Sequence, residues 1–218
     1  MCYSPEASFI AAGVLAPVGF AALRLVRQRD ELIVGALPLL FAGHQAVEGF
    51  VWLGVEGRLS AELLDVAIRV YLMIAQVVLP VLVPVGLLLF EQDSGRRRRL
   101  IPFVVVGLAV SGRLLWVITA HSVGARALDH SIVYDTDVHF GYVVAAGYVV
   151  ATCGPALLSG CSLLRGFGVA NLAALTLAAF LKYSAVTSVW CFYAALASGF
   201  IAIALRRRAA RAAVPSTP

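Results

Sequence analysis

Long apolar runs recur along the whole chain and are separated by short polar segments. Each run is close to the roughly 20 residues that an α-helix needs to cross the hydrocarbon core of a bilayer. Inside lipid the backbone must satisfy its own hydrogen bonds, which favours helices for such runs. The pattern therefore predicts an all-α fold, a bundle of seven transmembrane helices. The spans are expected at Ser8–Val26, Leu32–Gly54, Leu64–Phe90, Leu100–Ala120, Gly141–Gly160, Gly166–Leu181 and Thr187–Leu205.

Composition agrees with a chain that lives in a membrane. Of the 218 residues, 61% are hydrophobic and 13% are charged, and the mean hydropathy is +0.91. Soluble domains carry roughly 45–50% apolar and about 25% charged residues, so soluble and disordered chains are excluded. We expect residues 1–208 to form a single transmembrane domain and residues 209–218 to form a disordered cytoplasmic tail.

The basic residues predict the orientation of the bundle. Cytoplasmic loops of membrane proteins carry an excess of Lys and Arg, and twelve of the 17 basic residues here follow odd-numbered spans. These twelve are Arg24, Arg27, Arg29, Arg96, Arg97, Arg98, Arg99, Arg165, Arg206, Arg207, Arg208 and Arg211. The prediction is a multi-pass protein of the cell membrane with its N-terminus outside and its C-terminus in the cytoplasm. The net charge of +5 is then a topology signal, and no nucleic-acid partner is expected.

Ionisable residues inside the spans gather in the outer half of the predicted bundle. At 1.5 Å per residue, Glu48 lies roughly 9 Å below the outer end of its span, with His44 one turn deeper and Trp52 one turn higher on the same face. Buried ionisable groups are costly in a bilayer and usually face the bundle interior. The sequence therefore predicts a polar pocket around Glu48 that opens outward.

Residues of other spans reach the same depth and are candidates to line this pocket. They are Arg69, Arg113, Trp116, Trp190 and Cys191. The outer segment His121–Phe140 is long enough to cover the pocket. It carries His121, His130, Tyr134, Asp135, Asp137 and His139.

Purely structural roles explain several of these residues equally well. Glu48 could pair with Arg69 or Arg113 in a salt bridge that fixes helix packing. The three tryptophans could form an interfacial aromatic belt. The acids of the outer segment could belong to a solvated turn.

Three kinds of chemistry fit the predicted pocket. Desolvation favours the protonated form of a carboxyl group, so Glu48 could act as a general acid on a lipophilic substrate, with aromatic walls for a cationic intermediate. Alternatively, the pocket could bind a small anion or lipid headgroup without turnover. No cofactor is expected, but a metal ion is a third possibility. Its ligands would come from His44, Glu48, Cys2, Cys191 and either His130 or His139, and a Cys2–Cys191 disulfide would compete for the two sulfurs.

The opening Met-Cys-Tyr-Ser-Pro-Glu-Ala-Ser-Phe resembles the start of a bacterial multi-pass membrane family catalogued as a domain of unknown function. The block Leu37–Trp52, with a Gln and a Glu-Gly pair before Trp, looks like the second-span signature of that family, and Asp129–Tyr134 and Thr187–Ala195 look like its later signatures. The resemblance implies the fold but no activity. It draws attention to Cys2, Gln45, Glu48, His130, Trp190 and Cys191.

A small protein of seven spans with a carboxylate in the second span is also similar to the integral membrane terpene cyclases. That resemblance implies a second acidic residue in a late span, which this sequence lacks, so Asp135 or Asp137 would have to take its place. We therefore expect an enzyme for a lipophilic isoprenoid-type substrate. The expected catalytic residues are Glu48, Asp135 and Asp137. The expected substrate contacts are His44, Gln45, Trp52, Arg69, Arg113, Trp116, His130, Trp190 and Cys191. The oligomeric state stays open.

Overall fold

The computed structural model describes residues 4–128, 131–136, 141–181, 193, 195 and 197–212, and these are mostly helical. The helices are α1 (Pro5–Leu25), α2 (Leu32–Val55), α3 (Ala61–Leu72), α4 (Leu79–Phe90), α5 (Ser94–Ala120), α6 (Gly141–Leu157), α7 (Ser162–Leu181) and α9 (Gly199–Ala212). A short 3₁₀ turn, Arg29–Glu31, leads into α2, and a π-helical segment, Met73–Val78, joins α3 to α4. Two strands, β1 (Gly124–Leu128) and β2 (Ser131–Asp135), pair antiparallel.

Four helical stretches are long and apolar enough to cross a membrane. They are Pro5–Leu25, Arg29–Val55, Ala61–Phe90 and Ser94–Ala120. Gly141–Leu157 and Ser162–Ala178 are shorter apolar helices. The expectation of a helical fold with membrane-length apolar helices is therefore confirmed. The predicted bounds of the first three spans lie within three residues of these stretches, and the fourth stretch begins six residues before its predicted start.

Capping side chains explain where several helices begin. The Ser4 hydroxyl accepts a hydrogen bond from the Ala7 N–H, and the Ser60 hydroxyl does the same for the Leu63 N–H. The carboxylate of Asp93 accepts from the Arg96 N–H at 2.7 Å. Such caps satisfy N–H groups that have no partner inside the helix.

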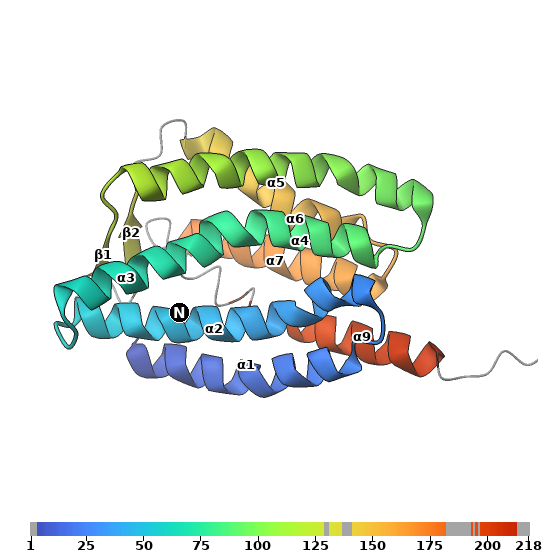
Figure 1. Ribbon diagram of the computed structural model, residues 1–218, viewed down its shortest axis with the longest axis horizontal. Helices are drawn as coiled ribbons and strands as arrows, with labels where there is room; N and C mark the ends of the chain where they lie inside the picture. Colours follow the sequence, from blue (N-terminus) through green and yellow to red (C-terminus); the bar gives the residue numbers. More distant parts are fainter. Residues whose placement is uncertain are drawn as a thin grey trace, which may run out of the picture.

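The helices lie side by side along the long axis of the molecule (Figure 1). Helix α1 packs along α2, and α9 lies beside α1 at the end where α2 begins. The largest apolar cluster, which contains Leu37, Phe41, Val83 and Ile201, joins α1, α2, α4, α6, α7 and α9. The start of α1 and the end of α9 lie at opposite ends of the bundle (Figure 1).

The outer segment differs from the prediction because it folds into a β-hairpin. Arg126 of β1 pairs in register with Val133 of β2. Ile132 is fully buried in a second apolar cluster together with Val51 and Trp52 of α2. The all-α expectation missed these strands, whose backbones pair with each other at one end of the bundle.

The polar segments at the other end are also more helical than predicted. Arg96–Arg99 lie in the first turns of α5 rather than in a loop. Helix α9 continues through Ala212, so residues 209–212 are helical and do not belong to a disordered tail. Residues 213–218, and residues 187–192, 194 and 196 of the predicted span Thr187–Leu205, lie outside the described residues.

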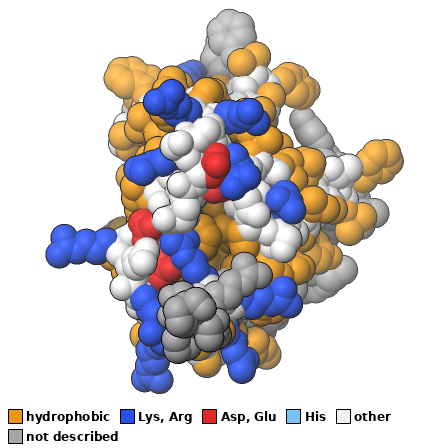
Figure 2. Space-filling model, turned by 90° about the vertical axis from the view of Figure 1, so that its right-hand side faces the viewer, with side chains coloured by type: hydrophobic (Ala, Val, Ile, Leu, Met, Phe, Trp, Pro, Cys, Tyr) orange, Lys and Arg blue, Asp and Glu red, His pale blue; other side chains and the backbone are white. Residues whose placement is uncertain are grey.

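This end of the molecule carries a crowd of basic side chains with a few acids among them (Figure 2). Glu31 is buried and accepts from Arg208 Nε at 2.8 Å, which ties the start of α2 to the end of α9. Burial alone would raise the pKa of Glu91. Hydrogen bonds from the backbone of Gly160 and Asp93, together with the Arg96 guanidinium, instead hold that pKa below its usual value. The acids thus fix arginines from different helices.

Helices α4 and α5 meet where a glycine lies against a proline carbonyl. Pro84 has no N–H to donate to the carbonyl of Pro80, and a Cβ added at Gly107 would overlap that carbonyl oxygen. Gly107→Ala is expected to lower the free energy of unfolding by about 1–3 kcal/mol because the two helices must separate. Gly112→Ala on the same helix is the control, since its Cβ would meet nothing within 4 Å. Thermal unfolding in detergent measures both, and an equal response of the two variants would contradict this packing.

Candidate functional site

Helix α2 places three polar side chains in the interior of the bundle. His44, Gln45 and Glu48 each have 0% exposed surface. The Gln45 amide Nε2 donates to Glu48 Oε2 at 3.3 Å. The spacing of three and four residues puts these side chains on one face of the helix, next to the buried Trp52. A polar cluster therefore occupies the part of α2 where the sequence predicted the pocket.

An aromatic stack extends this cluster to two other elements. The ring of His44 lies on the ring of Tyr71 of α3, with centroids 4.1 Å apart and planes 24° apart. Tyr71 in turn stacks on Tyr134 of β2, with centroids 4.4 Å apart. The hairpin thus covers the cluster, as the length of the outer segment suggested.

Several buried polar atoms of this region have no hydrogen-bond partner within the described part of the chain. They include both ring nitrogens of His44, the indole nitrogen of Trp52 and the amide oxygen of Gln76. Leaving a buried polar group unsatisfied costs about 1–3 kcal/mol, so such atoms call for a functional explanation. They can bond to a polar group of a ligand.

The backbone beside the stack is a π-helix, a form that is frequent at functional sites. Met73–Val78 begins two residues after Tyr71. Two carbonyls of this segment accept hydrogen bonds from side chains of other helices. The Ser111 hydroxyl donates to the Val77 carbonyl, and the Tyr148 hydroxyl donates to the Ala75 carbonyl. These contacts hold α3, α5 and α6 around the cluster.

Arg69 lies away from Glu48, although both were expected at the same depth. Its guanidinium pairs with Asp65 at 2.8 Å and donates to the Ile118 carbonyl at 2.8 Å. Arg113 is half-buried and makes no ion pair with any described residue. The structural alternative of a Glu48–Arg69 or Glu48–Arg113 salt bridge is therefore wrong.

Trp116 and Asp135 also point away from the cluster. The side chain of Trp116 is 63% exposed on α5, which agrees with the alternative of an interfacial aromatic residue. Asp135 forms a two-point ion pair with Arg126 across the hairpin, at 3.2 Å for each contact, and both side chains are exposed. The structure therefore does not bring Asp135 to Glu48 as a second acid.

The remaining predicted site residues lie outside the described residues. They are Cys2, His130, Asp137, His139, Trp190 and Cys191. Within the described ranges, no group of three or more His, Cys, Asp or Glu side chains could hold a metal ion. The described cysteines, Cys153 and Cys161, are free thiols.

Sequence reasoning underrated the tyrosines of this site. In the sequence, Tyr71 and Tyr148 differ from their neighbours only as isolated polar aromatic residues inside apolar spans. Ser111 carried the same weak signal. The stack of His44 on Tyr71 depends on how α2 and α3 are rotated against each other, which residue spacing within one helix does not reveal.

A model of a protein family covers nearly the whole of this chain. The family is described as a family of unknown function, DUF6629, and the match spans residues 1–216. The chain belongs to the DUF6629 family. Comparisons of this DUF6629 chain with curated proteins and with solved structures find no match. The buried cluster of the DUF6629 protein must therefore be interpreted from its own geometry.

Proposed function

We propose that this DUF6629 protein is an integral membrane enzyme that acts on a lipophilic, isoprenoid-type substrate, with Glu48 as general acid. The observation that carries the proposal is the complete burial of Glu48 on a helix that is long and apolar enough to cross a membrane, with Gln45 and the stacked ring of His44 on the same face. Among the described acids, Glu48 is the most deeply buried. A proton donor in a water-poor aromatic site is what an alkene or epoxide needs in order to react as a carbocation.

The proposed reaction is a redox-neutral cyclisation. The carboxyl group of Glu48 gives its proton to a carbon–carbon double bond or to an epoxide oxygen, and the resulting cation is attacked by the next double bond to close a ring. Loss of a proton from the last cation to the Glu48 carboxylate restores the acid and balances the reaction. Trp52 and Tyr134 offer ring faces that stabilise positive charge, and Tyr71 lies between the rings of His44 and Tyr134.

The proposal includes seven spans with the N-terminus outside. The helix starts and ends support an odd number of crossings, because α1 begins and α9 ends at opposite ends of the bundle (Figure 1). The basic residues gather at the end where α9 finishes (Figure 2), which supports a cytoplasmic C-terminus under the positive-inside rule. The Glu48 cluster then lies in the outer half of the bilayer.

A second candidate is a binding protein for the same class of lipophilic molecule without turnover. The exposed Asp135–Arg126 pair favours it, because a cyclase with two acids would need Asp135 next to Glu48.

The test uses membranes that contain the full-length protein and, as a control, membranes without it. Both are incubated with polyprenyl and epoxy-prenyl alcohols and diphosphates, and products are identified by mass spectrometry. Cyclic products that appear only with the protein support the enzyme. A substrate-dependent rise in thermal stability without any product supports the binding protein. The absence of both a product and a thermal shift across all of these substrates would refute an isoprenoid function.

A further inference from the structure

A second site lies at the basic end of the bundle, away from Glu48. A cavity of about 400 Å³ opens there between the end of α4, the start of α5, the turn from α6 to α7, and α9. This volume is within the range of small-ligand pockets. Its walls include Phe90, Glu91, Arg96, Gly160, Arg207 and Arg208. Figure 2 shows this end, where basic side chains surround a mixed polar and apolar surface.

Two of the three arginines in the cavity are fixed by acids from other elements. Arg208 pairs with Glu31 at 2.8 Å and with Asp30 at 3.6 Å, and it also lies over the ring of Phe90. Arg96 donates through Nε to Glu91 at 3.3 Å. Its guanidinium lies close to the backbone of Gly160, where an added Cβ would come within 3.0 Å of Nε. The glycine thus lets Arg96 approach the turn that leads into α7.

Arg207 is the cation of the cavity that no acid among the described residues neutralises. It is exposed and makes no ion pair with any described residue. An arginine offers five N–H donors in a planar fork that matches the oxygens of a phosphate. Arg207 therefore supplies a free charge beside two arginines that are already positioned.

The start of α7 adds further donors to the same cavity. Ser162 and Leu163 line it, and the first turn of α7 contains no acidic residue. The N–H groups at a helix start have no acceptor inside the helix, and the helix dipole favours negative charge there. Three arginines, a hydroxyl and a helix start thus converge on one space.

We propose that this cavity binds a phosphate group, carried by an anionic phospholipid or by a free phosphate ion. Phe90, Leu163 and Ala204 give it an apolar wall, which suits the glycerol and first acyl carbons of a lipid. The cavity lies at an end of the apolar helices, where headgroups meet protein. The inference is independent of the proposed activity at Glu48.

The test is binding to full-length protein purified in a neutral detergent. Native mass spectrometry compares phosphatidylglycerol with phosphatidylcholine, and inorganic phosphate is added as a competitor. Arg207→Gln is expected to weaken phosphatidylglycerol binding about tenfold, since hydrogen bonds to charged groups are lost. Arg206→Gln is the matched control, because Arg206 is the neighbouring exposed arginine and does not line the cavity.

Ser162→Asp separates a binding role from a structural one. A carboxylate at the first residue of α7 interacts favourably with the helix dipole, so thermal stability is expected to stay the same or rise. The same carboxylate repels a phosphate, so binding is expected to fall about tenfold.

Displacement of the lipid by inorganic phosphate would support the site and identify free phosphate as a ligand. Retention of the lipid would support the site with a lipid ligand. The proposal is overturned if the Arg206 and Arg207 variants lose binding equally, or if Ser162→Asp binds as well as the wild type. It is also overturned if the protein shows no preference for phosphatidylglycerol over phosphatidylcholine and does not bind inorganic phosphate.

Discussion

Replacing Glu48 by glutamine is expected to lower product formation by about 10²- to 10⁴-fold, the usual contribution of a general acid. Glutamine keeps the shape of the side chain, and its carbonyl oxygen can still accept the hydrogen bond from Gln45. It has no acidic proton to give to a double bond or an epoxide. The loss should therefore fall on kcat, while KM changes little.

Two matched variants control the Glu48 experiment. Glu62→Gln removes an exposed carboxylate from the first turn of α3 and should leave turnover unchanged. Asp135→Asn should change turnover less than twofold, because Asp135 pairs with Arg126 on the surface of the hairpin. Unchanged turnover in Glu48→Gln would rule out the acid. A loss in Asp135→Asn as large as in Glu48→Gln would show that the hairpin moves its acid to the substrate.

The apolar runs predicted the helices well because a bilayer leaves the chain few alternatives. The second span was predicted to begin at Leu32, where α2 begins, since charged residues precede it and an unbroken apolar run follows. Span three was predicted as one helix, and the structure inserts a π-helix between α3 and α4. The side chains that donate hydrogen bonds to its carbonyls, Ser111 and Tyr148, come from other helices, and these contacts cannot be read from the sequence of the span.

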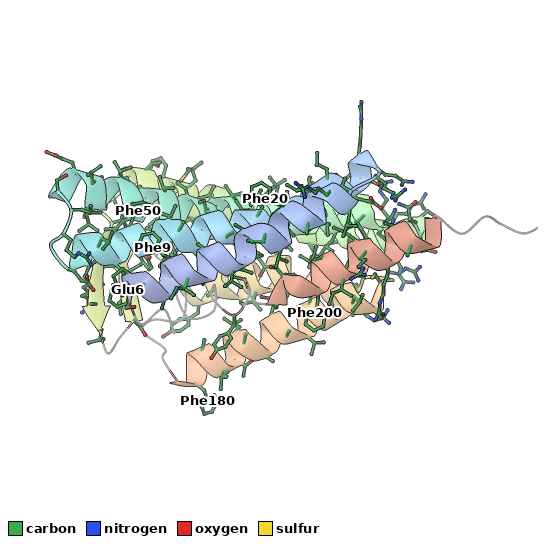
Figure 3. The ribbon with its side chains drawn as sticks, turned by 90° about the horizontal axis from the view of Figure 1, so that it is seen from below. Glu6, Phe9, Phe20, Phe50, Phe180 and Phe200 are labelled. Carbon is green, nitrogen blue, oxygen red and sulfur yellow. The ribbon has the colours of Figure 1, made fainter. Side chains whose placement is uncertain are left out.

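The sequence predicted a level along the helix for each candidate residue, but it could not predict the direction around the helix. Arg69 and Trp116 were expected near the cluster because they lie at its level. A helix that is apolar on all sides gives no signal of which face turns inward, and Trp116 turns outward. Phe180 is another residue whose direction cannot be predicted from the sequence. It is 90% exposed and projects from the end of α7 away from the neighbouring helices (Figure 3).

The hairpin and the acids of the basic end were missed for different reasons. Residues 131–134, Ser-Ile-Val-Tyr, contain β-branched and aromatic residues typical of a strand, and the prediction did not use this signal. The arginines of the other end were interpreted only as topology signals. Their pairing with Glu31 and Glu91 joins residues far apart in the sequence, so only the folded chain reveals it.

Glu31→Gln is expected to lower the free energy of unfolding by about 1.5–3 kcal/mol, because the charge-assisted hydrogen bonds to the buried carboxylate are weakened, while Arg208 keeps its ion pair with Asp30. Glu31 is 4% exposed and accepts from Arg208 Nε at 2.8 Å and from the Arg27 N–H at 2.8 Å. This carboxylate therefore links the turn before α2 to α9, near the end of the described chain. The variant should loosen α9 first, which hydrogen exchange of the Gly199–Ala212 amides would detect.

A double-mutant cycle with Arg208→Gln isolates the ion pair from the backbone contacts of Glu31. The double variant removes both charges, so it is expected to be less destabilised than the sum of the single variants by about 1–3 kcal/mol. Denaturation of the purified protein in detergent measures the three variants against the wild type. Strict additivity would mean that Glu31 stabilises the fold through the N–H groups of Arg27 and Gln28 alone, and that α9 is held by its apolar contacts with α1 and α7.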